Sequence, residues 1–305
     1  MNKKVTVRVP ATSANCGPGF DTLGLACNLY NYFTYELIDQ GLSLKIEGEG
    51  TEKLKAGKNN LAFLSFYKVW DMIVGSKTGL SVIMSNNIPL SRGLGSSSTA
   101  IVAGLVAAHH LTGNTLSKNE IVQLATEIEG HPDNVAPAIL GGMTISYVDN
   151  GRASSLKFLP LKPFKLVAVV PDMPLATSLA RRAIPKTVPH QDAVFNTSRA
   201  ALLVGAMLTG DYQHLAAGLD DRLHQPYRAH LIPGMEDAFK AAVNNGAFNA
   251  IISGAGSTLM AYVPINVSCE AVGEAMCKAL SEHDLHSVFH ILDIENLRRH
   301  YEKTL

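Results

Sequence analysis

The sequence has no excess of either charge sign, since 26 Lys and Arg residues balance 26 Asp and Glu residues among 305. A general nucleic-acid binder or membrane-surface binder would carry a basic surplus, so both classes are disfavoured, although a local basic pocket stays compatible. Charged residues make up only 17% of the chain and apolar residues 47%. The composition therefore supplies enough apolar mass for a core and excludes a disordered chain.

Cysteines are few and far apart, at Cys16, Cys27, Cys269 and Cys277. No C-x-x-C pair occurs, which argues against a zinc ribbon and against a thioredoxin-type motif. A disulfide scaffold is not expected at this length, so we expect reduced thiols in a reducing compartment.

Long hydrophobic runs are also missing. The opening MNKKVTVRVP alternates apolar and polar residues, without the apolar stretch of roughly 7–15 residues that marks a signal peptide. The longest apolar stretch, over 101–108, is far below the roughly 18–20 residues of a membrane span. We therefore expect a soluble, cytoplasmic protein without a membrane partner.

The length predicts one large or two medium domains, at roughly 100–200 residues per domain. A strand is expected over 4–9 and ends at Pro10, and a loop of small residues follows over 11–24. Further periodicities predict strands at 28–38, 42–46, 79–84, 143–148, 165–171, 249–254, 257–263 and 286–292. They predict helices at 60–74, 97–111, 117–129, 177–183, 190–209, 211–218, 236–245 and 268–282.

The chain turns polar over 149–165, with Asn150-Gly151 and then Pro160 and Pro163. We place the domain boundary there, which gives domains of residues 1–155 and 156–305. The alternation of strands and helices predicts an α+β fold in two closely packed halves.

The segment PLSRGLGSSSTA, residues 89–100, carries the strongest functional signal. Its glycines let the backbone approach a ligand closely, and the apolar helix that follows adds unsatisfied N–H groups and the positive end of its dipole. Such a loop suits a phosphate group. The P-loop lysine is absent, and Ser98 stands where a dinucleotide fingerprint has its third glycine. A simple capped Gly/Ser loop is the alternative.

This loop resembles the ATP-binding loop of the GHMP kinases, in which the pattern P-x-x-x-G-L-G-S-S surrounds the nucleotide phosphates. The resemblance implies a two-domain GHMP kinase fold, with an N-terminal ribosomal-protein-S5-like domain and a C-terminal ferredoxin-like α/β domain. It assigns ATP binding to Pro89, Leu90, Ser91, Arg92, Gly93, Leu94, Gly95, Ser96, Ser97, Ser98 and Thr99.

A second polar loop, PATSANCGPGFDTLG over 10–24, places Asn15 and Asp21 in a glycine-broken turn after a strand. Such residues often bond only their own backbone, but they also suit a polar substrate, with Asp21 holding an ammonium group. The string resembles the first motif of the homoserine kinase branch of the family. The segments typical of sugar and mevalonate kinases are absent. The resemblance implies that Asn15 and Asp21 contact L-homoserine.

The segment EIEGHPDNVAPA places two carboxylates at a helix end beside His131, Asp133 and Asn134. A zinc site would need more ligands than the sequence offers. Mg²⁺ needs only one carboxylate plus substrate phosphates, while a solvated last helical turn is the plain alternative. The resemblance implies Mg²⁺ at Glu129, with Glu127 as the alternative.

The hydroxyls of Ser96, Ser97, Ser98 and Thr99 can donate hydrogen bonds or add a magnesium ligand, and we assign that ligand to Ser97. The same resemblance places His131 and Asn134 at the acceptor site.

Thr177 and Arg181 lie one helical turn apart and face the same way. A substrate α-carboxylate calls for a bidentate arginine. The family pattern S-T-x-x-A-R-x-x-L-P fits here with Ala176 for Ser and Ile184 for Leu, and it points to Thr177 and Arg181 as acceptor residues.

The family pattern E-P-Y-R fits with Gln225 for Glu and points to Arg228. SGAGST over 253–258 resembles a further family motif and adds Gly254 to the acceptor site, although a simple hairpin turn would have the same glycines.

The resemblance as a whole implies transfer of the ATP γ-phosphoryl group to the side-chain hydroxyl of L-homoserine, a step towards threonine. We assign catalysis to Asn134 and Asp133, with Asp133 as the candidate base, and transfer without a dedicated base stays equally open. Another small-molecule kinase of the family and a non-catalytic relative are the alternatives. A homodimer is compatible with the sequence, and neither a nucleic-acid nor a membrane partner is expected.

Overall fold

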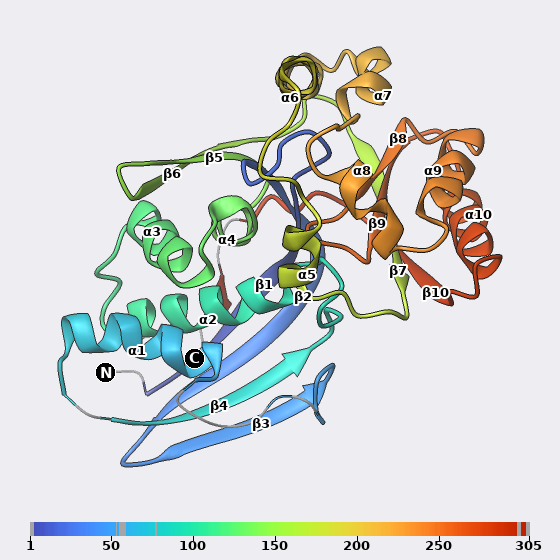
Figure 1. Cartoon of the computed structure of the whole chain (residues 1–305). Helices are drawn as coiled ribbons and strands as arrows, with labels where there is room; N and C mark the ends of the chain where they lie inside the picture. Colours follow the sequence, from blue (N-terminus) through green and yellow to red (C-terminus); the bar gives the residue numbers. More distant parts are fainter. Residues whose placement is uncertain (1–2, 53, 55–58, 77, 298–299, 303–305) are drawn as a thin grey trace.

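The computed structural model describes residues 3–52, 54, 59–76, 78–297 and 300–302, and it contains two β-sheets with helices packed on them (Figure 1). The first sheet has the strand order β11-β1-β2-β4-β3, and β5 pairs with β2 and with β6. Its strands are β1 (Lys4–Ala14), β2 (Leu23–Ile38), β3 (Leu42–Gly48), β4 (Gly79–Asn86), β5 (Met143–Asp149), β6 (Arg152–Phe158) and β11 (Tyr301–Glu302). All pairs are antiparallel except β3 with β4.

The second sheet is antiparallel, with the order β10-β7-β9-β8. Its strands are β7 (Phe164–Pro171), β8 (Asn249–Ile252), β9 (Leu259–Pro264) and β10 (Ser287–Leu292). Helices α9 (Met235–Asn244) and α10 (Cys269–Ser281) pack together on its outer side in Figure 1. Side chains from both sheets share one buried cluster that includes Leu25, Leu166 and Met260, so the two halves have a common core.

The remaining helices divide between the two halves. The first half contains α1 (Leu61–Ile73), α2 (Ser96–Leu111), α3 (Lys118–Glu129) and α4 (Pro132–Leu140). The second half contains α5 (Thr177–Arg182), α6 (His190–Thr209), α7 (Leu215–Gly218) and α8 (Gln225–Arg228), with 3₁₀ turns at Tyr212–His214 and Ala229–Leu231.

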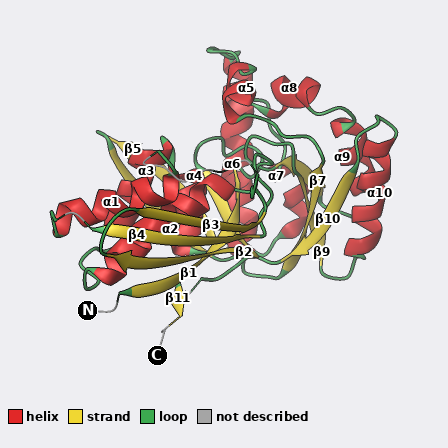
Figure 2. Ribbon diagram, turned by 90° about the horizontal axis from the view of Figure 1, so that it is seen from below, coloured by secondary structure: helices red, strands yellow, loops and turns green. Residues whose placement is uncertain are grey.

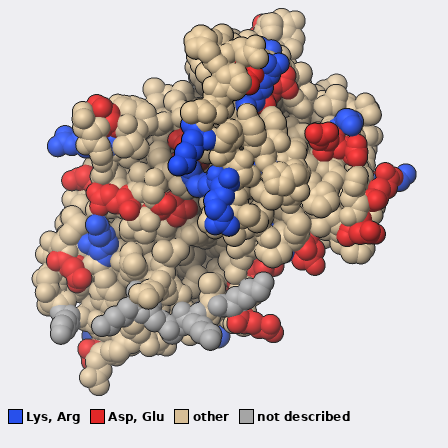
Figure 3. Space-filling view, in the orientation of Figure 1, with Lys and Arg blue, Asp and Glu red and all other residues tan. Residues whose placement is uncertain are grey.

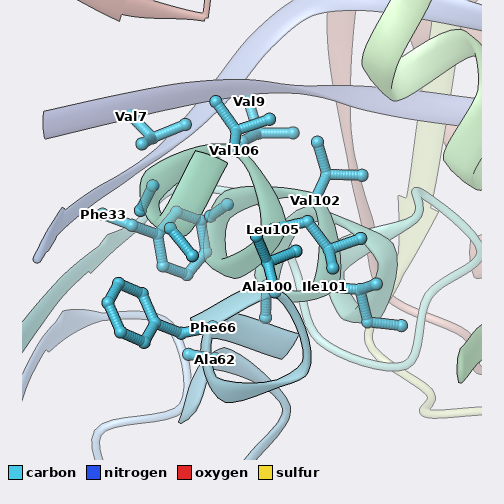
Figure 4. Close-up of a cluster of buried hydrophobic side chains, with 14 of the residues drawn as sticks. Val7, Val9, Phe33, Ala62, Phe66, Ala100, Ile101, Val102, Leu105 and Val106 are labelled. Carbon is cyan, nitrogen blue, oxygen red and sulfur yellow. The ribbon is translucent and has the colours of Figure 1, made fainter. Parts of the chain in front are cut away.

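Helix α2 lies in the centre of the first half, between the sheet and α1. Figure 4 shows Val7 and Val9 above it and Phe66 below it, with Val102 and Val106 among the side chains of the cluster. Because α2 is apolar on all its faces, burial from both sides stabilises it. This packing fixes the N-terminus of α2 at the rim of the sheet, where the glycine loop lies.

Most predicted elements are present, and two helices begin where capping predicts. Asn60 caps α1 by accepting from the amide of Ala62 at 3.0 Å, and Ser117 with Glu120 forms the capping box of α3. The expectation that Pro10 ends the first strand is wrong. β1 continues to Ala14 because a bulge between Pro10 and Ala11 shifts the register, so the strand continues although proline has no N–H.

The polar stretch predicted to separate the domains contains an additional strand. β6 pairs along its whole length with β5 across the turn at Asn150 and Gly151. Residues 156–158 therefore belong to the first sheet, three residues beyond the boundary predicted after residue 155. The chain also returns to this sheet at its end, where β11 pairs with β1 (Figure 2). Among the described residues, no helix is long and apolar enough to cross a bilayer.

Candidate functional site

The glycine loop connects β4 to α2 and is pressed against two other segments. Gly95 has φ +69° at the N-cap of α2, and a Cβ there would lie 2.0 Å from Thr12 Oγ1. Gly93 has φ +80°, and its Cβ would lie 2.2 Å from the carbonyl oxygen of Ser253. Only glycine fits both the backbone conformation and the space. No side chain caps α2, so its first N–H groups and dipole are available to an anion.

The loop forms one wall of a cavity of about 150 Å³ between the two halves of the molecule. Of the eleven residues predicted to bind ATP, seven line this cavity: Ser91, Arg92, Gly93, Gly95, Ser96, Ser97 and Ser98. Pro89 and Leu90 line a second cavity of about 830 Å³, and Arg92 borders both. Only the second volume lies in the roughly 300–1,000 Å³ range typical of organic ligands, so the glycine loop separates a small site from a larger one.

Two predicted loop residues have side chains that face the core. Leu94 is buried, with 1% of its surface exposed. Thr99 is fully buried, and its hydroxyl accepts from Asn31 Nδ2 at 3.0 Å and donates to the carbonyl of Ser96 at 2.7 Å. The Thr99 hydroxyl is thus occupied by two protein groups, and its contact with ATP stays a prediction.

The predicted acceptor residues line the same small cavity. They come from five separate segments: Asn15, Asp21, His131, Asn134, Thr177, Arg181, Arg228 and Gly254. The predicted magnesium ligand Glu129 and the candidate base Asp133 line the same cavity. Figure 3 shows basic side chains gathered near the middle of one face, in the region where Figure 1 shows α5, whose last turn contains Arg181 and Arg182. The fold thus brings together on one cavity all the acceptor residues that the sequence indicates.

Asn15 and Asp21 are held in left-handed backbone conformations, with φ of 70° and 54°. The Asn15 side chain accepts from the amide of Asp21 at 3.0 Å and donates to the carbonyl of Gly254 at 2.8 Å. Asp21 then forms a bidentate ion pair with Arg181 at 2.7 and 3.0 Å. This pair joins the first half of the molecule to α5, and it raises the pKa of Arg181.

Arg228 is almost completely buried, with 2% of its surface exposed. Its Nε donates to the carbonyl of Ala180 at 3.1 Å and its Nη1 to the carbonyl of Gly254 at 3.0 Å. Burial and the nearby Arg181 lower the pKa of Arg228 to about 10, so it stays cationic at neutral pH. A buried guanidinium beside a cavity suits a carboxylate ligand.

Glu129, and not Glu127, faces the glycine loop. Glu129 Oε1 accepts from the hydroxyl of Ser98 at 3.0 Å, and burial raises its pKa. Glu127 instead pairs with Lys68 at 3.0 Å on the surface. The hydroxyl in contact with Glu129 belongs to Ser98, whereas Ser97 is exposed at the cavity.

His131 and Asp133 form a hydrogen-bonded pair at the start of α4, between Nδ1 and Oδ1. Burial lowers the pKa of His131, but the hydrogen bond and the charge of Asp133, with help from Glu129, outweigh burial and raise it. Asn134 Oδ1 accepts from Thr12 Oγ1 at 2.8 Å. Asp21, His131 and Asp133 also place three ligand atoms within 4.8 Å of one another.

Three residues of the site were missed at the sequence level. Thr12 contacts Asn134, Phe20 lies under both arginines with centroid distances of 5.6 Å to Arg181 and 5.4 Å to Arg228, and His224 contacts Arg228. Thr12 and Phe20 belong to the polar loop motif itself, so their neighbours offered a signal. His224 offered none beyond its position just before the Q-P-Y-R string.

Comparison with known proteins places these features in a family. The GHMP kinases N terminal domain model matches residues 61–142, and the GHMP kinases C terminal model matches residues 203–282. A curated homoserine kinase from Desulfitobacterium hafniense is 41% identical over 292 residues, which cover 96% of this chain and 98% of that protein. The chain belongs to the homoserine kinases, a branch of the GHMP kinase family. It is therefore an enzyme of the kinase class.

Similarity to solved structures supports the assignment to this family. A homoserine kinase from Cytophaga hutchinsonii superposes with a TM-score of 0.91 at 27% identity, covering 99% of this chain and 98% of that one. A mevalonate kinase from L. major, solved with R-mevalonate, superposes with a TM-score of 0.75 at 17% identity, covering 97% and 98%. The second similarity extends the shared fold to GHMP kinases that are distant in sequence.

Proposed function

We propose that this GHMP kinase phosphorylates the side-chain hydroxyl of L-homoserine with ATP. The hydroxyl oxygen forms a bond to the γ-phosphorus, the bond from that phosphorus to the β,γ-bridging oxygen breaks, and the hydroxyl proton is released. The products are O-phospho-L-homoserine and ADP, on the way to threonine. The supporting observation is the juxtaposition, in one cavity, of an uncapped helix N-terminus with the carboxylate of Asp21 and the guanidinium groups of Arg181 and Arg228.

The two cavities suggest how the substrates divide. The γ-phosphate would lie at the glycine loop in the small cavity, and the nucleoside would extend past Pro89 and Leu90 into the larger one. Phosphoryl transfer needs mainly alignment and charge stabilisation, because its transition state is loose. Fixed backbone N–H groups would supply the charge stabilisation without having to reorganise during the reaction.

The acceptor is an α-amino acid with one charge of each sign. Its ammonium group would bind Asp21, and its carboxylate would bind Arg181 and Arg228. Asn15, His131, Asn134, Thr177 and Gly254 complete the walls. Because these groups come from segments already fixed by hydrogen bonds, they would orient the hydroxyl towards the phosphate.

The donor set near the loop fits a magnesium ion. Glu129 is a half-buried carboxylate that, among the described residues, forms no ion pair with Lys or Arg, and hard oxygen ligands are what Mg²⁺ prefers. We propose that Glu129 holds the ion, with Ser97 or Ser98 contributing a hydroxyl. When bound, Mg²⁺ would neutralise phosphate charge.

Asp133 is the candidate base, although its carboxylate is hydrogen-bonded to His131 in this structure. Replacing Asp133 with Asn removes the proton acceptor and keeps the shape. A fall in kcat of about 100-fold or more would support general-base catalysis, which typically contributes 10²–10⁴-fold. Unchanged turnover would leave transfer without a dedicated base, with Asn134 and the other acceptor groups acting by orientation.

A coupled ADP-release assay tests the function directly. We expect ADP release with ATP, MgCl₂ and L-homoserine, and much slower release with mevalonate or galactose. Activity on another alcohol alone would identify a different small-molecule kinase, and no ATP turnover with any acceptor would indicate a non-catalytic relative. A cytoplasmic location and a homodimer stay predictions alongside this proposal.

A further inference from the structure

His224 is a fully buried histidine that directly precedes α8, and its side chain contacts groups from both halves of the molecule. Its Nε2 lies 2.8 Å from the carbonyl oxygen of Gly17, in the loop that contains Asn15 and Asp21. Its Nδ1 lies 3.2 Å from Nη1 of Arg228. The ring therefore connects the loop at the ammonium end of the acceptor site with the arginine at the carboxylate end.

These contacts define the tautomer of His224. A carbonyl oxygen only accepts, so Nε2 must carry the hydrogen. Arg228 only donates, so Nδ1 must offer its lone pair. Both conditions hold for the neutral ring alone. Burial lowers the pKa of His224, which agrees with a neutral ring at pH 7.

The backbone around His224 is fixed independently. Asp221 accepts from the amides of Leu223 at 3.0 Å, His224 at 3.0 Å and Gln225 at 2.7 Å. Gln225 Oε1 then accepts from the amide of Ile252 in β8 at 2.7 Å. His224 thus stands on a rigid turn, and its contact with Arg228 does not depend on a mobile loop.

The contact determines how Arg228 can present itself to a ligand. Nε and Nη1 of Arg228 are committed to Ala180, Gly254 and His224. Among the described residues, the hydrogen bonds of the Arg228 side chain involve Nε and Nη1 and not Nη2, and Arg228 lines the small cavity. A guanidinium restrained at Nε and Nη1 keeps its remaining Nη2 group in one orientation, which suits a carboxylate oxygen placed in the cavity.

We propose that His224 is a positioning residue that orients Arg228 for the α-carboxylate of the acceptor, while its bond to the Gly17 carbonyl helps only to fix its own ring. The proposal rests on the proposed function, because it concerns how the same site selects an amino acid. It assigns His224 no contact with the substrate. Its effect should therefore appear in recognition of the carboxylate and not in ATP binding.

Two substitutions separate the two contacts. In His224→Asn the amide oxygen can take the place of Nδ1, which keeps the acceptor for Arg228. In His224→Gln the amide nitrogen can take the place of Nε2, which keeps the donor to Gly17 and loses the acceptor. His224→Phe removes both and keeps a ring against Phe20, whose centroid lies 5.2 Å from that of His224.

The experiment measures kcat and KM for the three variants and the unsubstituted enzyme, with thermal unfolding of each. We expect the KM for L-homoserine to rise about tenfold in the Gln and Phe variants, equivalent to about 1.4 kcal/mol. It should change less than threefold in the Asn variant, and the KM for ATP should change less than twofold in all three.

The compound 3-aminopropan-1-ol is L-homoserine without its carboxylate and serves as the matched probe. As a substrate, or as a competitive inhibitor where its turnover is too slow, it should bind all variants within twofold of the unsubstituted enzyme. The positioning role would be overturned if the variants lost affinity for L-homoserine and for this probe equally. It would also be overturned if the Asn and Gln variants had the same KM for L-homoserine. Absence of L-homoserine turnover in the unsubstituted enzyme would instead refute the proposed function.

Discussion

Gly95→Ala tests whether the glycine loop depends on close contact with β1. A Cβ at position 95 would lie 2.0 Å from Thr12 Oγ1 and 3.3 Å from Asn134 Oδ1. Thr12 would have to move by more than 1 Å, which breaks its 2.8 Å hydrogen bond to Asn134. The substitution therefore affects both the anion site and a residue of the acceptor site.

The magnitude follows from two contributions. Alanine in a left-handed conformation costs roughly 1–2 kcal/mol, and reduced freedom of the unfolded chain offsets part of this, which leaves about 1 kcal/mol. Breaking a buried hydrogen bond while leaving one partner unsatisfied adds about 1–3 kcal/mol. We expect Gly95→Ala to lower the free energy of unfolding by about 2–4 kcal/mol.

Gly113, just beyond the other end of α2, provides a matched control. Its φ is +96°, and a Cβ there meets no atom within 4 Å. Gly113→Ala should therefore show only the conformational cost of about 1 kcal/mol. Urea unfolding would give both stabilities, and initial rates would give kcat/KM for ATP, which we expect to fall at least tenfold in Gly95→Ala and to stay within twofold in Gly113→Ala.

A double-mutant cycle tests whether Gly95 and Thr12 are in direct contact. Thr12→Ala removes the oxygen in the way, so Gly95→Ala combined with Thr12→Ala should be less destabilised than the sum of the two single variants. If Gly95→Ala is as stable as Gly113→Ala, or if the two substitutions add without interaction, the contact between the loop and β1 does not act as described.

Three further predictions follow from the site and the core. Glu129→Gln should lower kcat at saturating MgCl₂ by about 100-fold. The control is Glu127→Gln, because the Glu127 carboxylate pairs with Lys68 at the surface, and its kcat should stay within twofold. Equal effects of the two substitutions in a magnesium titration of initial rates would reject Glu129 as the ligand. Asp21→Asn should raise the KM for L-homoserine at least tenfold. It should lower the free energy of unfolding by no more than about 1 kcal/mol, because both partners of its ion pair are more than a third exposed. A much larger loss of stability in urea unfolding would contradict this. Burial lowers the pKa of His300 from 6.5 to about 4, so between these values the unfolded chain binds a proton that the folded chain does not, and stability falls as the pH falls. His300→Gln should therefore reduce the loss of stability between pH 7 and pH 5 by about 2 kcal/mol in urea unfolding, and an unchanged pH dependence would contradict the buried neutral ring.

Sequence periodicity and capping predicted most of the fold because those signals are local. The Ser117–Glu120 capping box and the Asn60 cap depend on residues within one helical turn, and both are present. The failures involve pairing between segments. β6 has a polar, edge-strand sequence, and only its partner β5 makes it a strand. β1 passes Pro10 because a bulge accommodates the proline, and no local pattern predicts that bulge.

The site shows the same difference between local signals, which the sequence carries, and contacts between distant segments, which it does not. Motif residues such as Asp21 and Arg181 could be listed from the sequence, but their bidentate contact could not, because 160 residues separate them. Glu129 and Glu127 became distinguishable only when the structure showed one facing Ser98 and the other Lys68. His224 escaped notice because its contacts with Gly17 and Arg228 arise only after both halves have folded.

The return of the chain to its first sheet at β11 makes the second half an insertion, from β7 to β10, between two strands of the same sheet. Cutting the chain after Phe158 would therefore not yield two independent folding units. The isolated first fragment would expose the edge of β1 that β11 covers, and an uncovered edge strand invites pairing between copies. The first and last strands of the chain are neighbours, since Thr6 of β1 pairs with Glu302 of β11. A circular permutant opened between β6 and β7 would therefore keep every strand pair that a simple truncation destroys.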